Sequence, residues 1–176
     1  MDKKITIAID AMGGENAPTK NIEGVSLFLK KNNKKKDVHF NLYGDEDLIK
    51  KELNKHNIPS DLYEIIPSST VVSDEETPLT AIKNSKDSSM WNSINSQITS
   101  DSNITLSAGN TGVLFVVSRM LLKTIDSVSK PALAGLWPNE KNMNVVLDLG
   151  ANVECDEKNL IDFSEMGAAL FKALFP

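Results

Sequence analysis

The chain has 176 residues, of which 40% are hydrophobic and 24% charged, and its formal net charge is −5. These values are ordinary for a globular protein with a hydrophobic core. Arg119 is the only arginine among the 19 basic residues, which argues against a nucleic-acid-binding protein, because such proteins usually present an arginine-rich face.

The cysteine content and the hydropathy pattern indicate the compartment. Cys155 is the only cysteine, so no internal disulfide can form and a reducing compartment is expected. The N-terminus leads into a β-branched run and not into a secretory apolar region. The longest apolar run, residues 113–122, is too short to span a bilayer and contains Ser118 and Arg119. We therefore predict a soluble cytoplasmic protein.

Apolar runs and helical periodicity alternate along the chain. Strands are predicted at residues 4–10 and 38–43, within 58–66, and at 104–106, 131–137 and 144–149. Helices are predicted at residues 19–31, 45–56, 79–85, 87–98, 113–123 and 159–174. This alternation predicts an α/β fold with three αβα layers and a mostly parallel, Rossmann-like sheet. We expect a single domain over residues 1–176.

Three loops rich in glycine, hydroxyl and amide groups follow predicted strands, at residues 10–14, 107–112 and 148–152. Ligands of open α/β sheets bind beyond the carboxyl ends of the strands. Small residues let a ligand approach the backbone, and the free N–H groups at a helix start favour an anion. We expect the three loops to meet and to bind a phosphorylated or otherwise anionic ligand.

Other kinds of site lack their signatures. His39 lies in the exposed phase of a predicted strand and His56 at the end of a lysine-rich helix, so we interpret both as surface residues. Without a placed histidine, a Ser-His or Cys-His nucleophile is not expected, and Cys155 is interpreted as a buried or bystander thiol. Neither metal-ligand spacing nor a dinucleotide or P-loop motif occurs, so we predict no metal and no cofactor.

Charged groups outside these loops have two interpretations. Lys83 and Lys86 precede Ser88 and Ser89, and they form either a solvated helix face or a cationic clamp with hydroxyl donors. The lysine run at residues 34–36 is interpreted as a solvated loop, because it has no aromatic or arginine neighbours.

In chain order, several motifs resemble those of the PlsX family, the phosphate acyltransferases of bacterial phospholipid synthesis. The resemblance rests on Asp10-Ala11-Met12-Gly13-Gly14 with Ala17-Pro18, Lys83-x-x-Lys86-Asp87-Ser88-Ser89-Met90, Ser107-Ala108-Gly109-Asn110-Thr111-Gly112, Lys130-Pro131-Ala132-Leu133 and residues 146–153. Two positions depart from the family pattern: Glu15 replaces an aspartate, and Lys83 replaces a frequent arginine that could contact phosphate in a bidentate manner. The resemblance covers roughly the first half of a family member.

The resemblance implies a fold like those of isocitrate and isopropylmalate dehydrogenases and of phosphotransacetylases, here as the N-terminal part of a longer fold. It also implies a reaction in which a long-chain acyl thioester of acyl carrier protein and inorganic phosphate give acyl phosphate. The implied partners are acyl carrier protein, a second copy of the chain in a homodimer, and a membrane-bound glycerol-3-phosphate acyltransferase that uses the product. A peripheral position at the inner face of the membrane is a further expectation.

This chemistry needs little general acid or base, because phosphate already carries nucleophilic oxyanions and a thiolate leaves readily. The enzyme must instead position its substrates and stabilise an oxyanion. The residues expected to be catalytic are Asn110, Thr111 and Lys83. The residues expected to bind phosphate or substrate, or to orient the loops that do, are Gly13, Gly14, Ser88, Gly109, Gly112, Asp10, Asp148 and Asn152.

Three alternatives stay open at this point. The chain resembles phosphate acetyl- and butyryltransferases in chemistry, and the acyl donor would then be a CoA thioester. It could instead be a non-catalytic remnant of the longer enzyme, which its apolar C-terminal helix favours. The third alternative is a simple anion-binding module.

Overall fold

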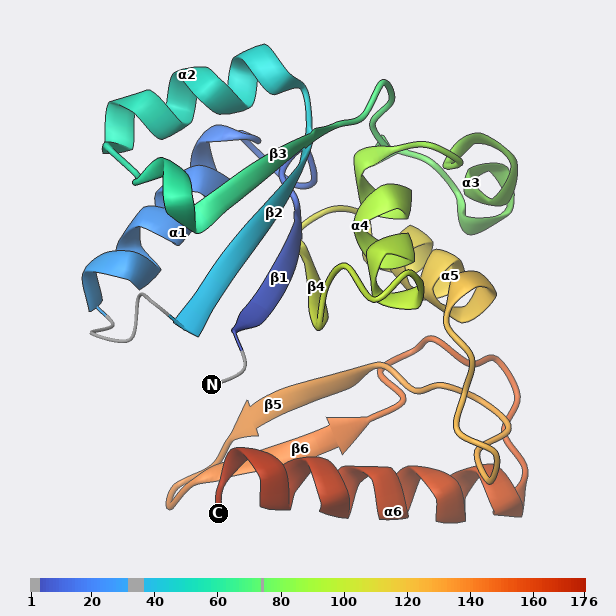
Figure 1. The fold of residues 1–176 in the computed structure, drawn as a ribbon. Helices are drawn as coiled ribbons and strands as arrows, with labels where there is room; N and C mark the ends of the chain where they lie inside the picture. The colour runs from blue at the N-terminus through green and yellow to red at the C-terminus, as the bar shows by residue number, and fades with distance from the viewer. Residues whose placement is uncertain (1–3, 32–36, 74) are drawn as a thin grey trace. The chain divides into compact units, whose positions relative to one another are not determined.

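The computed structural model describes residues 4–31, 37–73 and 75–176, and the chain forms two compact units (Figure 1). Unit 1 comprises Met1–Leu122 and unit 2 comprises Lys123–Pro176. The predicted solvated loop at residues 34–36 lies outside the described residues. The prediction of a single domain over residues 1–176 remains a prediction.

Unit 1 is built on a parallel sheet. Its strands are β1 (Ile5–Asp10), β2 (Val38–Gly44), β3 (Tyr63–Pro67) and β4 (Ile104–Ser107). The order across the sheet is β3-β2-β1-β4, and every neighbouring pair runs parallel. The predicted α/β class with a mostly parallel sheet is therefore confirmed, and the direction in which the chain crosses the sheet reverses at β1.

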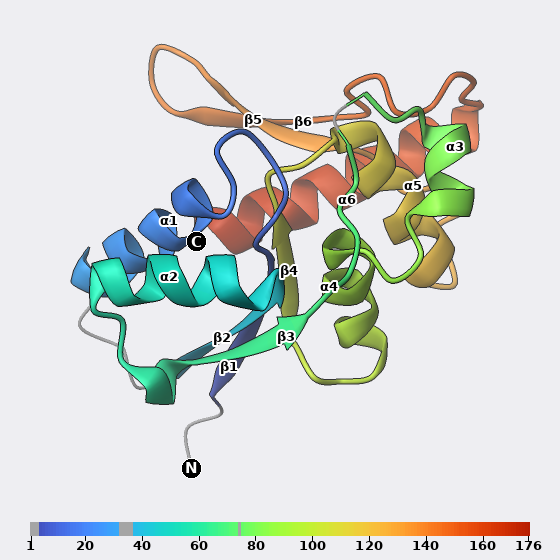
Figure 2. The ribbon, with the colours of Figure 1, turned by 90° about the horizontal axis from the view of Figure 1, so that it is seen from above.

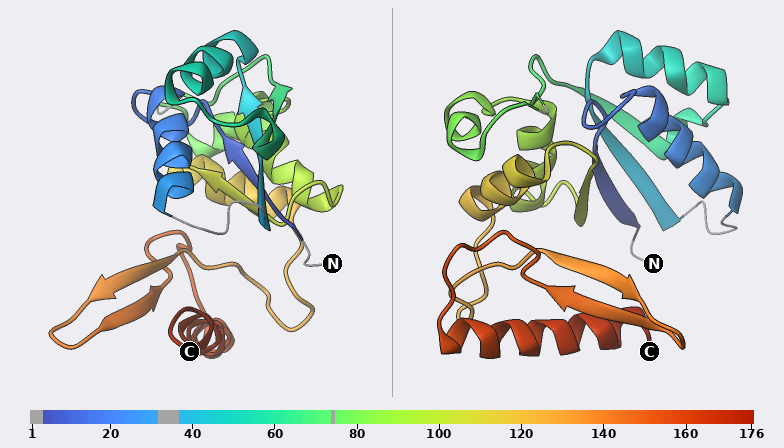
Figure 3. Two further views of the ribbon diagram at one scale, coloured as in Figure 1. Left: turned by 60° about the vertical axis from the view of Figure 1, so that its left-hand side comes forward. Right: turned by 180° about the vertical axis from the view of Figure 1, so that it is seen from behind.

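Helices cover both faces of this sheet, as expected for a three-layer fold. On one face lie α1 (Thr19–Lys31) and α2 (Glu46–His56), and on the other lie α4 (Ser89–Ile98) and α5 (Thr111–Leu121) (Figures 2 and 3). A short helix, α3 (Pro78–Asn84), packs against α5, and a proline occupies its first position, where proline is favoured. The weak strand signal within residues 58–66 corresponds to a 3₁₀ turn, η2 (Ser60–Leu62), followed by β3.

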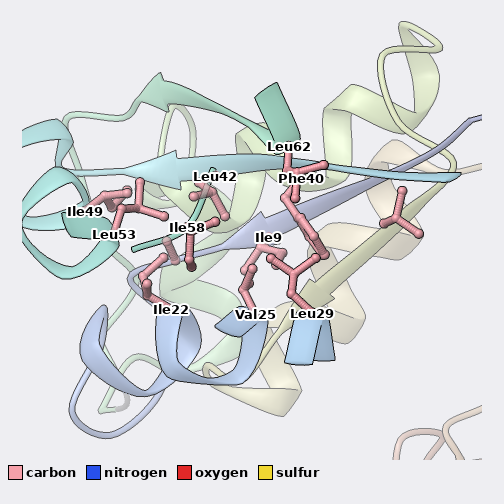
Figure 4. Close-up of a cluster of buried hydrophobic side chains, with 12 residues drawn as sticks. Ile9, Ile22, Val25, Leu29, Phe40, Leu42, Ile49, Leu53, Ile58 and Leu62 are labelled. Atoms are coloured by element: carbon pink, nitrogen blue, oxygen red, sulfur yellow. The ribbon is translucent and has the colours of Figure 1, made fainter. Parts of the chain in front are cut away.

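The main core of unit 1 lies between the sheet and the helices α1 and α2. Alternate residues of β2, among them Phe40 and Leu42, point toward Ile22 of α1 and Leu53 of α2 (Figure 4). This is the strand alternation and the helical stripe seen in the sequence. A second apolar cluster joins α4 to α5 through Met90, Ile94, Val113 and Val117.

Unit 2 has a different architecture. Its strands β5 (Ala134–Pro138) and β6 (Met143–Leu147) form an antiparallel two-stranded sheet, and α6 (Glu157–Leu174) packs against β6 (Figure 3). Their antiparallel pairing differs from the parallel pairing of the unit 1 strands. Only residues 139–142 connect these two strands, and a connection of this length is too short for a parallel crossover. Asn139 folds it into a tight turn by accepting hydrogen bonds from the N–H groups of Lys141 and Asn142.

The helix α6 begins with a capping box. Asp156 accepts a hydrogen bond from the N–H group of Asn159, and the Asn159 side chain accepts one from the N–H group of Asp156. Two of its apolar residues differ in burial, because Phe163 is buried whereas Leu160 is 59% exposed. Among the described residues, no helix combines the length and hydrophobicity needed to cross a bilayer.

Candidate functional site

The loops after β1 and β4 lie side by side at the carboxyl edge of the unit 1 sheet. The two strands are neighbours, and Asp10 pairs in register with Ser107. From β1 the chain passes to α1 on one face, and from β4 it passes to α5 on the other. This divergence is the topological switch point at which open α/β sheets bind ligands. Two of the three predicted loops are thus brought together.

Asp10 and Ser107 link these two loops. The Ser107 hydroxyl donates a hydrogen bond of 2.7 Å to Asp10 Oδ2 and accepts one of 3.1 Å from the N–H group of Gly109. Asp10 is 1% exposed, and its Oδ1 atom has no hydrogen-bond partner among the described residues. A buried carboxylate requires polar partners, so this relay fixes the position of the Ser107 loop relative to β1.

The glycines of the β1 loop permit this close approach. A Cβ atom on Gly13 would lie 2.4 Å from Asp10 Oδ2 and 2.9 Å from the Gly109 nitrogen. Gly14 has a φ of +89°, and a Cβ atom there would lie 2.6 Å from the carbonyl oxygen of Ala108. On the other side of the loop, Asn21 of α1 donates hydrogen bonds to the carbonyl oxygens of Ala11 and Gly13. The backbones of the two loops are therefore in contact.

Asn110 fixes the start of α5. Its Oδ1 atom caps the helix by accepting a hydrogen bond from the N–H group of Val113, and its Nδ2 atom donates to the carbonyl oxygen of Glu76. Thr111 and Gly112 form the exposed first turn, where backbone N–H groups have no acceptor within the helix. The Asn110 amide is thus engaged in holding the loop, while the N–H groups of Thr111 and Gly112 point beyond the helix end.

The segment containing Lys83 and Ser88 has an exposed part and a buried part. Lys83 and Lys86 are exposed. Ser88 is 1% exposed and caps α4 by accepting a hydrogen bond from the N–H group of Trp91. The hydroxyls of Ser85 and Ser89 are also buried, and neither has a partner among the described residues. Ser88 therefore shapes the backbone here, whereas the two lysines contact solvent, as do Asn84 and Asp87.

The third predicted loop belongs to unit 2 and is held by its own residues. Asp148 has a φ of +59°, and its Oδ1 atom accepts hydrogen bonds from both the backbone N–H group and the side-chain amide of Asn152. The same amide donates to the carbonyl oxygen of Pro131. The hydrogen bond from the Asn152 side chain helps to lower the pKa of Asp148 below its usual value. The expectation that this loop meets the other two remains a prediction.

Cys155 lies beside this loop. It is exposed and not buried, and its Sγ atom donates a hydrogen bond of 3.4 Å to Asp148 Oδ2. Desolvation and the contact with Asp148 raise the pKa of the Cys155 thiol, and nearby Lys130 opposes this increase only in part. A thiol with a raised pKa is a poor nucleophile, which favours the bystander interpretation.

The histidines lie away from the β1 and β4 loops. His39 is half-buried and lines a polar cavity of about 570 Å³ with Tyr43, Glu64 and Asp101. Desolvation lowers the pKa of His39, and the charge of Lys4 adds to this effect. His56 is half-buried at the end of α2, so neither side chain is a fully exposed surface residue. Within residues 4–31, 37–73 and 75–176, no group of three or more His, Cys, Asp or Glu side chains is arranged to hold a metal ion.

Several residues that hold the site together carry no clear signal in the sequence. Asn21 donates a hydrogen bond to a backbone carbonyl group of the β1 loop, and the backbone carbonyl group of Glu76 accepts one from the Asn110 side chain. Only the packing of α1 and α3 reveals their positions. The Asp10–Ser107 pair, in contrast, could have been inferred, because Asp10 ends one predicted strand and Ser107 directly follows another.

Comparison with known proteins identifies the family. The model of the fatty acid synthesis protein family matches residues 5–175. The chain is 48% identical to the phosphate acyltransferase of Pelagibacter ubique over 176 residues, which are 100% of this chain and 51% of the relative. It is 37% identical to that of Rhodopseudomonas palustris, with 99% of this chain and 49% of the relative covered, and 36% identical to that of Neisseria meningitidis, with 98% and 48% covered. The chain thus spans about half the length of these relatives, and it belongs to the fatty acid synthesis protein family, the PlsX family.

Proposed function

We propose that this chain contributes the phosphate-binding half of an acyltransferase that makes acyl phosphate from a long-chain acyl thioester of acyl carrier protein. The observation that carries the proposal is the junction of the β1 and β4 loops at the topological switch point of the sheet. The exposed first turn of α5 lies at this junction and offers the N–H groups of Thr111 and Gly112 to an anion.

The proposed reaction is a substitution at the thioester carbonyl carbon. An oxygen of phosphate attacks this carbon, the carbonyl oxygen becomes an oxyanion, and collapse of the tetrahedral intermediate breaks the C–S bond. The products are acyl phosphate and the carrier-protein thiolate, which takes up a proton from water. The developing negative charge requires hydrogen-bond donors and not a metal or a strong base, and backbone N–H groups supply such donors.

Individual residues have different roles in this proposal. Thr111, Gly112 and the adjacent Gly109 form the phosphate and oxyanion cradle, with Gly13 and Gly14 forming its opposite wall. Exposed Lys83 provides positive charge to the anion. Asn110 is a positioning residue, because both ends of its amide hold the start of α5 in place.

The loop-holding contacts of four further residues suggest supporting roles. Asp10 and Ser88 fix the unit 1 loops from buried positions, and Asp148 and Asn152 hold the unit 2 loop. We propose that these residues orient backbone groups toward the substrates.

The names of the relatives support acyl transfer to phosphate, and the finer identity of the partners is part of the proposal. We propose that the donor is acyl carrier protein and that the working enzyme is a cytoplasmic homodimer at the inner membrane surface. A glycerol-3-phosphate acyltransferase in the membrane would then consume the acyl phosphate, because this mixed anhydride is unstable in water and must be used near its source.

Turnover assays test the activity and the donor. The chain is purified alone and after co-expression with the second half of the Pelagibacter ubique relative, and each sample receives phosphate with a palmitoyl thioester of either acyl carrier protein or CoA. Phosphate-dependent formation of acyl phosphate with the carrier-protein thioester is expected. Turnover with the CoA thioester alone would replace the donor, and a co-purified complex without turnover on either thioester would contradict the proposed activity.

The length comparison favours a second candidate, in which this chain alone is not catalytic. It covers only about half of each relative, so groups beyond its length could be needed for turnover. In that case the chain alone should bind phosphate without making acyl phosphate, whereas turnover by the purified 176-residue chain would exclude this candidate.

A further inference from the structure

The face of the unit 1 sheet on the α4 side is polar. On β2, His39, Asn41 and Tyr43 alternate with Phe40 and Leu42, which belong to the apolar core on the other face. The helix α4 contacts β1, β2 and β4. Beside it, residues of β2, β3 and α4 line the polar cavity of about 570 Å³. This volume falls within the range of about 300–1,000 Å³ that small-molecule sites occupy.

The lining of this cavity is negatively charged. Glu64 of β3 and Asp101, which follows α4, both line it and are exposed. No lysine or arginine is among the residues that line it, and neither carboxylate forms an ion pair within the described part of the chain. Desolvation lowers the pKa of His39, and Lys4 adds to this effect, so the imidazole is uncharged near neutral pH. The cavity therefore presents two carboxylates without a compensating cation.

Hydrogen bonds hold Asp101 in position at the cavity. Asn41, which is 5% exposed, donates a hydrogen bond of 3.3 Å to the carbonyl oxygen of Asp101. The Thr99 hydroxyl donates one of 2.6 Å to Asp101 Oδ2, and the N–H group of Asp101 donates to the carbonyl oxygen of Ser96. A carboxylate that is already ordered loses little conformational entropy when a ligand binds. Asp101 is thus prepared to accept a hydrogen bond from a cation.

We propose that this cavity is a binding site for a small organic dication with two ammonium groups. One ammonium group would bind the carboxylate of Glu64 and the other that of Asp101, because the two acids belong to different elements of the lining. The Asn95 amide and the Thr6 hydroxyl also line the cavity and offer further acceptors for N–H groups. A metal ion fits less well, since within the described ranges no three His, Cys, Asp or Glu side chains are arranged to hold one.

This site is separate from the proposed phosphate cradle. None of the cradle residues after β1 and β4 lines the cavity. The required ligand also has the opposite charge, since the cradle offers N–H groups to an anion and the cavity offers carboxylates to a cation. Binding of a dication therefore does not depend on the proposed acyl transfer.

Calorimetric titration with putrescine, a four-carbon diamine, tests the site. The titration uses the purified chain near neutral pH in about 0.1 M salt, which screens exposed charges more than about 10 Å apart. Saturable binding at one site is expected. Butylamine has the same carbon chain with a single ammonium group, and it should bind at least tenfold more weakly. No saturable binding of putrescine, or equal affinity for butylamine, would overturn the proposal.

Two isosteric variants test the two carboxylates. Glu64→Gln and Asp101→Asn each remove one charge from an exposed side chain, so both should fold like the original chain. Each should weaken putrescine binding by about tenfold or more, the loss expected for one hydrogen bond between charged groups. Glu23→Gln is the matched control, since Glu23 lies on α1 outside the cavity and its side chain is 43% exposed. Binding that is unaffected by the first two variants, or weakened equally by all three, would overturn the proposal.

NMR chemical shifts locate the bound diamine. Putrescine should shift the side-chain amide signals of Asn41 and Asn95 and leave that of Asn110, at the start of α5, unchanged. Shifts confined to Asn110 and the loops after β1 and β4 would place the diamine at the phosphate cradle and overturn the proposal.

Discussion

Asp10 ends β1 and Asp148 directly follows β6, and each begins a glycine-containing loop, yet the two units use them differently. In unit 1, Asp10 is buried and binds Ser107 on a neighbouring strand, so two loops distant in sequence are joined. In unit 2, Asp148 is half-buried and binds Asn152 four residues later. The same local pattern thus builds a composite site in one case and stabilises a single loop in the other.

The units also differ in the core that supports these loops. Unit 1 has two clusters of buried apolar side chains, whereas Phe163 is the only buried apolar side chain of unit 2, all of which the structure describes. A two-stranded hairpin is marginally stable at best and depends on packing against another element, and in unit 2 the packing with α6 buries a single apolar side chain. Unit 1 therefore carries the stability of the site, and the following predictions test this difference, beginning with the largest expected effect.

Truncation of a core residue should separate the two units most clearly. Leu53 is 2% exposed in the main cluster of unit 1, and Leu53→Ala should lower the free energy of unfolding by about 2–5 kcal/mol. Leu160 on α6 is 59% exposed, and Leu160→Ala should change it by less than about 0.5 kcal/mol. Urea unfolding followed by circular dichroism measures both. Equal effects would show that α6 is as well buried as α2.

A methyl group at the loop junction should be the next most costly change. Gly13→Ala forces a Cβ atom against Asp10 and the Gly109 backbone, and we expect a loss of about 1–3 kcal/mol in the free energy of unfolding. Gly24→Ala is the matched control in the same unit. Its Cβ atom meets no other atom within 4 Å, so this variant should gain about 0.5–1 kcal/mol. A neutral Gly13→Ala variant would refute the close contact of the loops.

Removal of one hydroxyl should distinguish the joined loops from the single loop. Ser107→Ala removes a partner of buried Asp10 and the acceptor of the Gly109 N–H group, and should cost about 1–3 kcal/mol. Asn152→Ala breaks hydrogen bonds around a less buried carboxylate, so a cost of at most about 1 kcal/mol is expected. Amide chemical shifts provide a second measurement, because only Ser107→Ala should perturb residues on both β1 and β4.

The smallest effect concerns the pH dependence of unit 2. Because the folded-state pKa of Asp148 is lowered, its stabilising contribution is present above the unfolded-state pKa of about 3.9 and is lost as the pH falls through the folded-state value. Asn152→Ala should raise the pKa of Asp148, as measured by NMR titration of its carboxyl carbon. An unchanged pKa would mean that Asn152 does not stabilise the carboxylate.

Much of unit 1 could be predicted from sequence because local pattern and burial agree there. The alternation of Phe40 and Leu42, and the helical spacing of Ile22, Val25 and Leu29, identify the faces that pack together. In unit 2, the strands were predicted but their antiparallel pairing was not, because strand propensity does not specify a partner. The short turn at Asn139 is the feature that excludes a parallel crossover.

The candidate site could be predicted only in part, for a similar reason. The loops at Asp10 and Ser107 are visible because glycine and polar residues follow apolar strands. The role of Asn110 was not visible, because an asparagine before a helix is equally consistent with a cap and with a ligand contact. Its bonds to Val113 and Glu76 depend on the packing of α3 against α5, which the local sequence does not reveal.

Thr111 offers a way to remove one proposed phosphate donor without unfolding α5. It occupies the first position of the helix, where proline is favoured because the N–H group that proline lacks would have no acceptor within the helix. Asn110 has φ of −53° and ψ of 112°, an extended conformation that a residue before proline can adopt. Glu46→Pro is the corresponding change at the first position of α2, remote in sequence from the β1 and β4 loops.

The most direct test of the phosphate cradle is a calorimetric titration of phosphate into the purified chain, Thr111→Pro and Glu46→Pro. We predict saturable binding to one site that Thr111→Pro weakens by about 10- to 100-fold, the loss expected for one hydrogen bond to a charged group. Glu46→Pro should bind phosphate as tightly as the original chain. An original chain that does not bind phosphate, or a Thr111→Pro variant that binds it equally well, would contradict the assignment of the β1 and β4 loops as a phosphate site.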